Sequence, residues 1–466
     1  MCKGDAPEAL RLVDLALAVS PDLPAALYNR AVLLRALGKE RDAEDSARRA
    51  TEADPNLAEA WDLRAQIASA QGAVEEASAC HARALQIQPQ NAHFIGHAAV
   101  TLATQGRLKE ALAAARHAEK IDPSWPPMAL GNMLKACGYP AEAATRFAKL
   151  RAMFPHSADA AASEAMAYLQ QGDFDKGLPL WEQRPDFRAA LDGMTLWQGE
   201  WVDTLYMYED QGLGDALCFL RYLPLLRERV GRVCLSVPEP LYQLCGENWP
   251  DMEIGFEVKG EGMPPALLQG ISLKSARCRL SSLPFHFSTR VDTIPSAPYL
   301  KAAPEKRALW HERLEKIPKP RIGVVWAGNA SFKQDQTRSL PPALLPDFLA
   351  GLESHSVLLQ KDRDALPIPG LFDAAPFLSD FADTAALLSE LDLLISVDTA
   401  PAHLAGALGV PLWLLVPFDP DWRWFLNRSD SPWYPSARLF RQPEPMDWGS
   451  VLAEVKRRIQ IIPETP

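Results

Sequence analysis

Three groups of polar residues in the second half of the chain have the types and spacing that proton transfer and anion binding require. The first is Gly212-Leu213-Gly214-Asp215, which lies between a predicted strand and a predicted helix. The glycines let the backbone approach a ligand, and Asp215 falls at the helix start as a candidate general base or simply a helix cap. A helix N-terminus lowers the pKa of a carboxylate, so Asp215 is an effective base only if burial opposes that effect.

The second group lies in the polar loop after the apolar run that ends at Trp326. Asn329, Ser331, Lys333 and Arg338 place hydrogen-bond donors and two cations near the end of a predicted strand. A lysine acts as a point charge and an arginine as a bidentate fork, so the combination suits a diphosphate. A solvated polar loop is the alternative interpretation.

The third group is Asp398-Thr399-Ala400-Pro401-Ala402-His403, inside a predicted βαβ unit at residues 392–417. Apolar runs predict strands at Leu393–Val397 and Val410–Val416, with a helix between them at Pro401–Leu408. Asp398 and Thr399 follow the first strand, and either could cap the helix. Ligands of open α/β sheets bind at that edge, where a helix N-terminus attracts phosphate. His403 is a candidate ligand contact or a satisfied interior histidine.

These groups must be positioned by alternating strands and helices. Further strands are predicted at Leu205–Tyr208, Val233–Val237, Ile254–Val258, Gly270–Leu273, Arg321–Trp326 and Ser356–Gln360. Helices are predicted at Ala216–Val230 (kinked or ended by Pro224), Leu241–Gly246, Pro341–Leu352, Thr384–Leu391 and Trp448–Ile459. A proline-rich linker, Pro295–Pro320, separates two halves of this pattern. The pattern therefore predicts two Rossmann-like domains facing each other across a cleft.

The first part of the chain repeats with a period of 34 residues. The period is carried by Pro21, Pro55, Pro89 and Pro123, by Gly38, Gly72 and Gly106, and by Ala43, Ala77 and Ala111. It slips by two residues at Gly138 and recovers at Gly172. The pattern resembles the tetratricopeptide repeat (TPR), with a half repeat at residues 6–20, four full units and a last helical pair ending near Arg188. A solenoid of this kind holds a peptide or another protein on its concave face; a spacer or dimerisation element is the alternative.

Composition excludes several other classes. The formal net charge of −11 argues against a nucleic-acid-binding surface. The seven cysteines lack CxxC spacing, which favours buried free thiols in a reducing compartment, and no apolar run reaches the length of a membrane span. We therefore expect a soluble, cytoplasmic protein.

Motifs of other enzyme classes are missing. The sequence has no HExxH zinc motif, no GxSxG hydrolase elbow and no GxxxxGK[ST] phosphate loop. DxD triplets at Asp362/Asp364 and Asp419/Asp421 occur at about the frequency that chance gives, and we predict no metal site.

The segments RIGVVWAGN and SVDTAPAHLAGALGVPLW, with GLGD and Pro224 upstream, resemble the heptosyltransferase family (family 9) of glycosyltransferases. The resemblance covers residues 200 to 460 and implies a GT-B fold, in which two Rossmann-like domains bind acceptor and nucleotide-sugar donor. It implies that Asp215 takes the acceptor hydroxyl proton and that Lys333 neutralises the donor phosphate. Asp398, Thr399 and His403 match the family's DSGxxH motif at the donor. Ala400 departs from the glycine of that motif, which leaves the sugar open.

The predicted site therefore has a catalytic Asp215, a glycine loop with Gly212 and Gly214, and a set of donor-binding residues. That set is Asn329, Ser331, Lys333, Arg338, Gln360, Asp398, Thr399 and His403. Arg423 is a candidate phosphate contact, and the aromatic residues around it either face the sugar or base, or form ordinary packing.

The predicted architecture is a TPR α-solenoid (residues 1–190) followed by an α/β GT-B fold, with an acceptor domain at 191–305 and a donor domain at 306–466. The predicted function is sugar transfer without metal or other cofactor from a nucleotide sugar to a protein held by the repeats, such as flagellin or another surface protein. The alternatives are a non-catalytic TPR scaffold with a nucleotide-sugar-binding GT-B domain, and a transferase acting on lipopolysaccharide.

Overall fold

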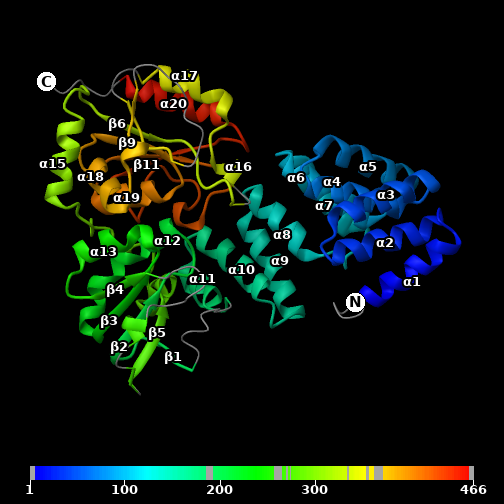
Figure 1. Ribbon diagram of the computed structural model, residues 1–466, viewed down its shortest axis with the longest axis horizontal. Helices are drawn as coiled ribbons and strands as arrows, with labels where there is room; N and C mark the ends of the chain where they lie inside the picture. Colours follow the sequence, from blue (N-terminus) through cyan, green and yellow to red (C-terminus); the bar gives the residue numbers. More distant parts are fainter. Residues whose placement is uncertain are drawn as a thin grey trace. The chain divides into compact units, whose positions relative to one another are not determined.

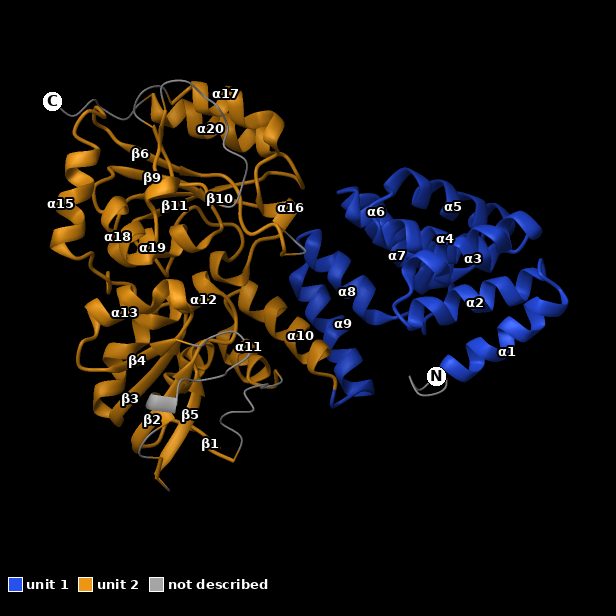
Figure 2. Ribbon diagram, in the orientation of Figure 1, with its two compact units in different colours: residues 1–156 blue, residues 157–466 orange. Residues whose placement is uncertain are grey.

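The computed structural model describes residues 6–184, 193–256, 265–268, 271–272, 274–332, 335–352, 356–361 and 371–460. Internal contacts divide the chain into two compact units, residues 1–156 and 157–466 (Figures 1 and 2). The first unit is helical, and the second holds two parallel sheets with helices around them.

Antiparallel helix pairs build the first unit. Its helices are α1 (Ala6–Val19), α2 (Pro24–Ala36), α3 (Glu40–Ala53), α4 (Ala58–Ala70), α5 (Val74–Ile87), α6 (Ala92–Thr104), α7 (Leu108–Ile121), α8 (Pro127–Ala136) and α9 (Pro140–Met153). The periodic glycines join the paired helices at positive φ, for example 74° at Gly38 and 78° at Gly72, where residues with a side chain are strained. Ala43, Ala47 and Ala50 are fully buried, so the helices pack closely on this small-residue face. The 34-residue pattern is confirmed as a helical repeat.

One buried carboxylate interrupts the apolar packing of these helices. Asp62 on α4 lies 3.4 Å from Nδ1 of His81 and 2.7 Å from Nδ1 of His97. Burial raises the pKa of Asp62, but its contacts with the two histidines outweigh burial and lower it from 3.8 to about 2. The ionised carboxylate therefore stabilises the folded repeats.

The second unit begins with a helical hairpin formed by α10 (Ala158–Gln170) and α11 (Phe174–Trp181). The hairpin follows the repeat pattern and turns at Gly172, where φ is 81°. A Cβ at Gly172 would lie 3.2 Å from Val291 and 3.7 Å from Phe425, so the turn is packed against residues of the α/β part. By its contacts this last repeat hairpin belongs with the sheets.

Five strands form the first sheet: β1 (Thr195–Leu196), β2 (Val202–Tyr208), β3 (Val230–Val237), β4 (Glu253–Phe256) and β5 (Ser275–Arg279). Their order is β1-β5-β2-β3-β4, and every pairing is parallel. Around them lie α12 (Leu213–Phe219), the 3₁₀ helix η2 (Leu220–Glu228), η3 (Glu239–Leu241), α13 (Tyr242–Asn248), η4 (Pro265–Leu268), η5 (Leu280–Ser282) and α14 (Leu283–His286).

Six strands form the second sheet: β6 (Ile322–Val325), β7 (Ser356–Leu358), β8 (Phe372–Asp373), β9 (Leu393–Val397), β10 (Leu412–Val416) and β11 (Ala437–Arg441). Their order, β11-β10-β9-β6-β7-β8, is that of a doubly wound Rossmann sheet, and every pairing is parallel. Its helices are α15 (Pro304–Arg313), α16 (Asp335–Arg338), η6 (Pro342–Leu344), α17 (Leu345–Ala350), η8 (Ala375–Phe377), α18 (Phe381–Leu388), α19 (Ala400–Leu408), η9 (Trp422–Trp424) and α20 (Trp448–Ile459).

The largest differences between the predicted elements and the structure concern one helix and one strand. The predicted helix Ala216–Val230 is wrong in type over half its length, because the α-helix ends at Phe219 and continues as 3₁₀ helix η2. Pro224 lacks the amide hydrogen that an α-helix interior needs, which explains the change. The strand predicted at Gly270–Leu273 lies partly outside the described residues, and the structure has its strand at Ser275–Arg279 instead.

Candidate functional site

The two sheets meet through the helices that follow β2 and β9. Helix α12 follows β2 and helix α19 follows β9, so both begin at the carboxyl ends of parallel strands, where α/β proteins bind ligands. A Cβ placed on Gly214 would lie 2.8 Å from Cδ2 of His403 and 3.6 Å from Cα of Ala400. Gly214 therefore lets α12 approach α19, and the space that its missing side chain leaves is filled by His403.

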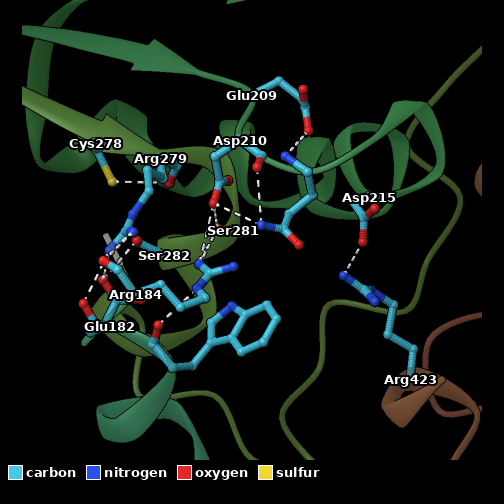
Figure 3. Close-up of polar contacts among 12 residues, drawn as sticks. Glu182, Arg184, Glu209, Asp210, Asp215, Cys278, Arg279, Ser281, Ser282 and Arg423 are labelled. Carbon is cyan, nitrogen blue, oxygen red and sulfur yellow. Dashed lines mark hydrogen bonds and ion pairs between the residues drawn. The ribbon is translucent and has the colours of Figure 1, made fainter. Parts of the chain in front are cut away.

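Asp215 contacts a cation from the second sheet's half of the unit. Its Oδ1 forms an ion pair with Nη2 of Arg423 (Figure 3). Nη1 of Arg423 donates to Oδ1 of Asp421 at 2.7 Å. The Arg423 guanidinium also lies over the Phe219 ring, at 4.9 Å, and its side chain is only 4% exposed. Arg423, predicted as a phosphate contact, is thus placed beside the predicted base.

The pKa of Asp215 reflects its half-buried position beside Arg423, with 29% of its side chain exposed. Burial raises the pKa of Asp215, and the nearby Arg423 charge opposes that shift without cancelling it. The carboxylates of Asp421 and Asp398 add to the upward shift, while His403 opposes it. Burial thus opposes the lowering that a helix N-terminus gives a carboxylate, and the pKa of Asp215 is raised overall.

His403 lies within a polar cluster at the start of α19. Its Nε2 is 3.6 Å from Oδ1 of Asp398, and its Nδ1 is 2.9 Å from the Tyr434 hydroxyl. Burial lowers the pKa of His403, but interactions with Asp398 and Cys218 outweigh burial and raise it to about 9. Burial likewise raises the pKa of Asp398, yet His403 and the charge of Arg338 lower it overall. The start of α19 therefore carries a buried imidazolium as well as its helix dipole.

Thr399 does not cap α19. It is the residue before the helix, but its side chain makes no capping hydrogen bond; Oγ1 donates to the Val397 carbonyl at 3.2 Å and lies 3.0 Å from Oγ of Ser396. Of the two predicted caps, Thr399 is therefore wrong, because a closer carbonyl and hydroxyl at the end of β9 engage the threonine. Pro401 does occupy the first turn, as predicted.

Only some of the predicted donor-binding residues in the loop after β6 lie close to the start of α19. Asn329 and Ser331 are exposed, and Oδ1 of Asn329 accepts from both the amide and the hydroxyl of Ser331 at 2.9 Å. Nε of Arg338 donates to Oδ1 of Asp335 at 3.2 Å. The charge of Arg338 acts on Asp398, so these two predicted residues are close to one another. Lys333 lies outside the described residues.

Gln360 braces the ends of β6 and β7. Its Oε1 accepts from the amides of Trp326 (3.1 Å) and Ala327 (2.9 Å), and its Nε2 donates to the carbonyls of Ala327 and Lys361. An amide side chain has two acceptor and two donor positions, and all four are used here. Gln360 therefore shapes the strand end, and a donor contact stays a prediction.

A second polar cluster at the edge of the first sheet was missed by sequence reasoning. Nη2 of Arg184, just after α11, donates to Oγ of Ser281 at 2.8 Å and pairs with Asp210 at 3.2 Å (Figure 3). Ser281 follows β5 and donates to Asp210, which follows β2, at 2.9 Å. Glu182 accepts from Ser282 at 2.7 Å and pairs with Arg279 at 3.4 Å. The partners lie far apart in sequence, so no local spacing signals the cluster.

Burial determines the ionisation of this cluster. Burial lowers the pKa of Arg184 to about 10, and burial raises the pKa of Glu182. The Arg423 charge contributes to the lowering at Arg184, so the cluster and the Asp215–Arg423 pair share one electrostatic environment. The last repeat hairpin thus supplies charged residues to the edge where β2 and β5 end.

The described residues also bear on metal binding, membrane insertion and thiol chemistry. Within the described ranges, no group of three or more His, Cys, Asp or Glu residues is arranged to hold a metal ion. In the same part of the chain, none of the helices combines the length and the apolar character that crossing a bilayer requires. The cysteines there are thiols that take part in no disulfide: Cys80, Cys137, Cys218, Cys234, Cys245 and Cys278.

Family models match the chain twice, both as tetratricopeptide repeat, at residues 24–57 and 130–189. The repeats therefore mark a protein-interaction region. Among curated proteins, the chain is 25% identical over 275 residues to Protein FlbA of Caulobacter vibrioides (strain ATCC 19089 / CIP 103742 / CB 15). That match covers 54% of this chain, and the chain spans 45% of the length of FlbA.

Several solved structures of repeat proteins are similar to part of the chain. YrrB, described as a TPR protein with an unusual peptide-binding site, is 20% identical, with 37% of this chain and 89% of that chain covered and a TM-score of 0.30. A thermophilic TPR protein of Thermus thermophilus is 23% identical, with coverage of 36% and 92% and a TM-score of 0.33. PilF of Pseudomonas aeruginosa is 20% identical, with coverage of 36% and 78% and a TM-score of 0.33.

Proposed function

We propose that the chain is a GT-B glycosyltransferase, which moves a sugar from a nucleotide sugar to a protein held by its tetratricopeptide repeats. The observation that carries this proposal is the meeting of two parallel sheets, the second of them doubly wound, at Asp215, Arg423 and His403. A half-buried carboxylate from one sheet and buried cations from the other suit transfer from an anionic leaving group.

The roles follow from the charges. Asp215 takes the proton of the acceptor hydroxyl as the acceptor oxygen attacks the anomeric carbon and the bond from that carbon to the diphosphate breaks. The electron pair of that bond leaves with the nucleoside diphosphate, beside Arg423, Arg338, His403 and the start of α19. One such electrostatic contact is typically worth about 3 kcal/mol, and a positioned base roughly 10²- to 10⁴-fold in rate. The reaction in this proposal uses no metal, because the side-chain cations stabilise the leaving group.

The acceptor is proposed to be a protein because a repeat solenoid precedes the α/β part. Tetratricopeptide repeats hold peptides and proteins along a concave face, which suits delivery of a polypeptide to a transferase. A surface protein such as flagellin is the acceptor class to be tested first, on the basis of this architecture alone.

Mass spectrometry tests the proposal. The full chain is incubated with candidate surface proteins and a panel of nucleotide sugars, CMP-linked acids included, and the acceptor is examined for a mass increment of one sugar. We expect an increment with the wild-type chain and a loss of roughly 10²- to 10⁴-fold in rate with Asp215→Asn. The matched control is Asp175→Asn, because Asp175 pairs with Arg290 at the surface with 70% of its side chain exposed. Absence of an increment with every donor would contradict the proposal.

A non-catalytic scaffold is the second candidate, favoured by the pairing of Asp215 with Arg423 and by Ala400 in place of the motif glycine. In a scaffold, nucleotide sugars bind and raise the melting temperature, but the chain transfers nothing. Nucleotide-induced stabilisation without transfer that depends on Asp215 would favour this candidate.

A further inference from the structure

Arg423 contacts two carboxylates, one from each half of the second unit. Its Nη2 pairs with Asp215, at the carboxyl end of β2, and its Nη1 donates to Asp421 at 2.7 Å. The residue itself follows β10, at the same edge of the second sheet as the start of α19. Its Nε is buried without a hydrogen-bond partner, so the guanidinium retains a donor that neither carboxylate uses.

The loop that carries Arg423 is held firmly from outside the second sheet. Nε2 of Gln170, the last residue of α10, donates to Oδ1 of Asp419 and to the Pro420 carbonyl, both at 2.9 Å. Phe174 of α11 packs edge-on against Trp422 at 5.8 Å. Because the α10–α11 hairpin braces the backbone of this loop, we expect a change of partner at Arg423 to occur by rotation of its side chain about the Asp421 contact.

We propose that Arg423 is a counter-ion shared between Asp215 and the diphosphate of the donor. Before a donor binds, Arg423 holds Asp215 as an unreactive carboxylate; when the diphosphate binds, Nη2 turns to it and Asp215 is released to accept the acceptor proton. The inference rests on the proposed glycosyltransferase function. It gives an order of binding, donor before acceptor, because Asp215 becomes available to the acceptor hydroxyl only after the diphosphate has drawn Arg423 away.

The charges around Asp215 determine whether its pKa rises or falls when Arg423 turns away. Asp215 is faced by Arg423 and Asp421 from the loop around η9, and by Asp398 and His403 from the end of β9 and the start of α19. On the other side, Arg423 shares its environment with Arg184 at the end of α11. When Arg423 turns away, Asp215 keeps two carboxylate neighbours and one imidazolium, so its affinity for protons rises. At pH values near the pKa of Asp215, binding of a diphosphate is therefore accompanied by partial proton uptake, and the fraction of Asp215 that stays ionised acts as the stronger base.

The coupling is reciprocal by thermodynamic necessity. If the diphosphate draws Arg423 from Asp215, then removing the Asp215 charge must free Arg423 and tighten binding of the diphosphate. A tenfold change in affinity corresponds to one pKa unit at Asp215, and we expect an effect of about that size in Asp215→Asn.

Isothermal titration calorimetry on the full chain tests this inference. UDP, GDP and ADP are each titrated in buffers of different ionisation enthalpy, and the dependence of the heat on buffer gives the protons taken up. We expect uptake with the wild-type chain, no uptake and roughly tenfold tighter binding with Asp215→Asn, and no uptake with weaker binding for Arg423→Gln. Asp175→Asn is expected to match the wild type in affinity and uptake.

The outcomes separate the two proposals. Binding without proton uptake by the wild-type chain, or binding to Asp215→Asn that is no tighter, overturns the shared counter-ion and leaves the transferase proposal standing. The uptake measurement needs only the wild-type chain, so it decides the question even if a variant fails to fold. No binding of UDP, GDP or ADP overturns the shared counter-ion and excludes these three diphosphates as leaving groups of the proposed transfer.

Discussion

Replacing Gly214 with alanine tests the close approach of helices α12 and α19. The new Cβ would lie 2.8 Å from Cδ2 of His403 and 3.4 Å from its Nε2, and the histidine is held by Asp398 and Tyr434. Because the neighbour cannot easily move, we expect an overpacking cost of about 1–3 kcal/mol. A helical glycine also gains up to about 1 kcal/mol on replacement by alanine, which opposes that cost.

Gly246→Ala is the matched control, because it isolates the propensity term. Gly246 lies in helix α13 with nothing within 4 Å of its Cβ position, so its replacement is expected to stabilise the chain by up to about 1 kcal/mol. Urea unfolding is followed by tryptophan fluorescence, which reports mainly on the second unit because all but two of the 13 tryptophans lie there. We expect the free energy of unfolding of Gly214→Ala to lie about 1–3 kcal/mol below that of Gly246→Ala. Equal values for the two variants would refute the packing described for the site.

Two further predictions concern buried charge. Asp62→Asn is expected to lower the free energy of unfolding by about 2 kcal/mol at pH 7, because a carboxylate with its pKa lowered from 3.8 to about 2 stabilises the fold above pH 3.8. The difference from the wild type is expected to fade as the pH falls towards 2. Urea unfolding followed by circular dichroism at both pH values checks this, and a difference that persists at pH 2 would contradict it. Arg184→Ala is expected to lower the free energy of unfolding by about 3 kcal/mol, because it leaves the largely buried Asp210 without its cation. Arg227→Ala breaks an exposed pair with Asp251 and is expected to lower it by less than about 1 kcal/mol. Similar losses in the two variants would show that the Arg184 cluster is not a buried ion pair.

The parts of the fold that local periodicity encodes could be predicted from the sequence. Strand β9 and helix α20 have the predicted bounds, and Gly409 ends α19 in the left-handed conformation at φ 78°. The repeat glycines fall at turns with positive φ because their spacing reflects one supersecondary unit repeated along the chain. Very short strands such as β8, with two residues, have too few positions for a periodic signal.

The candidate site could be predicted only as separate segments. The sequence predicts Asp398 at a strand end, Asp215 at a helix start and His403 one helical turn beyond Asp398. The structure brings all three together at the start of α12 and α19. The pairing of Asp215 with Arg423 joins residues 208 positions apart, and that of Arg184 with Asp210 depends on a repeat hairpin that packs with the sheets. Contacts of this kind are set by tertiary packing, which no local spacing records.

Hydrogen–deuterium exchange with and without a bound nucleoside diphosphate tests the central claim most directly. If the donor binds at the edge where the two sheets meet, peptides covering residues 398–406 and 418–426 exchange more slowly in its presence, while peptides covering residues 24–104 of the repeats are unchanged. Slower exchange confined to other parts of the chain, with no change in these two segments, would contradict the proposed donor site.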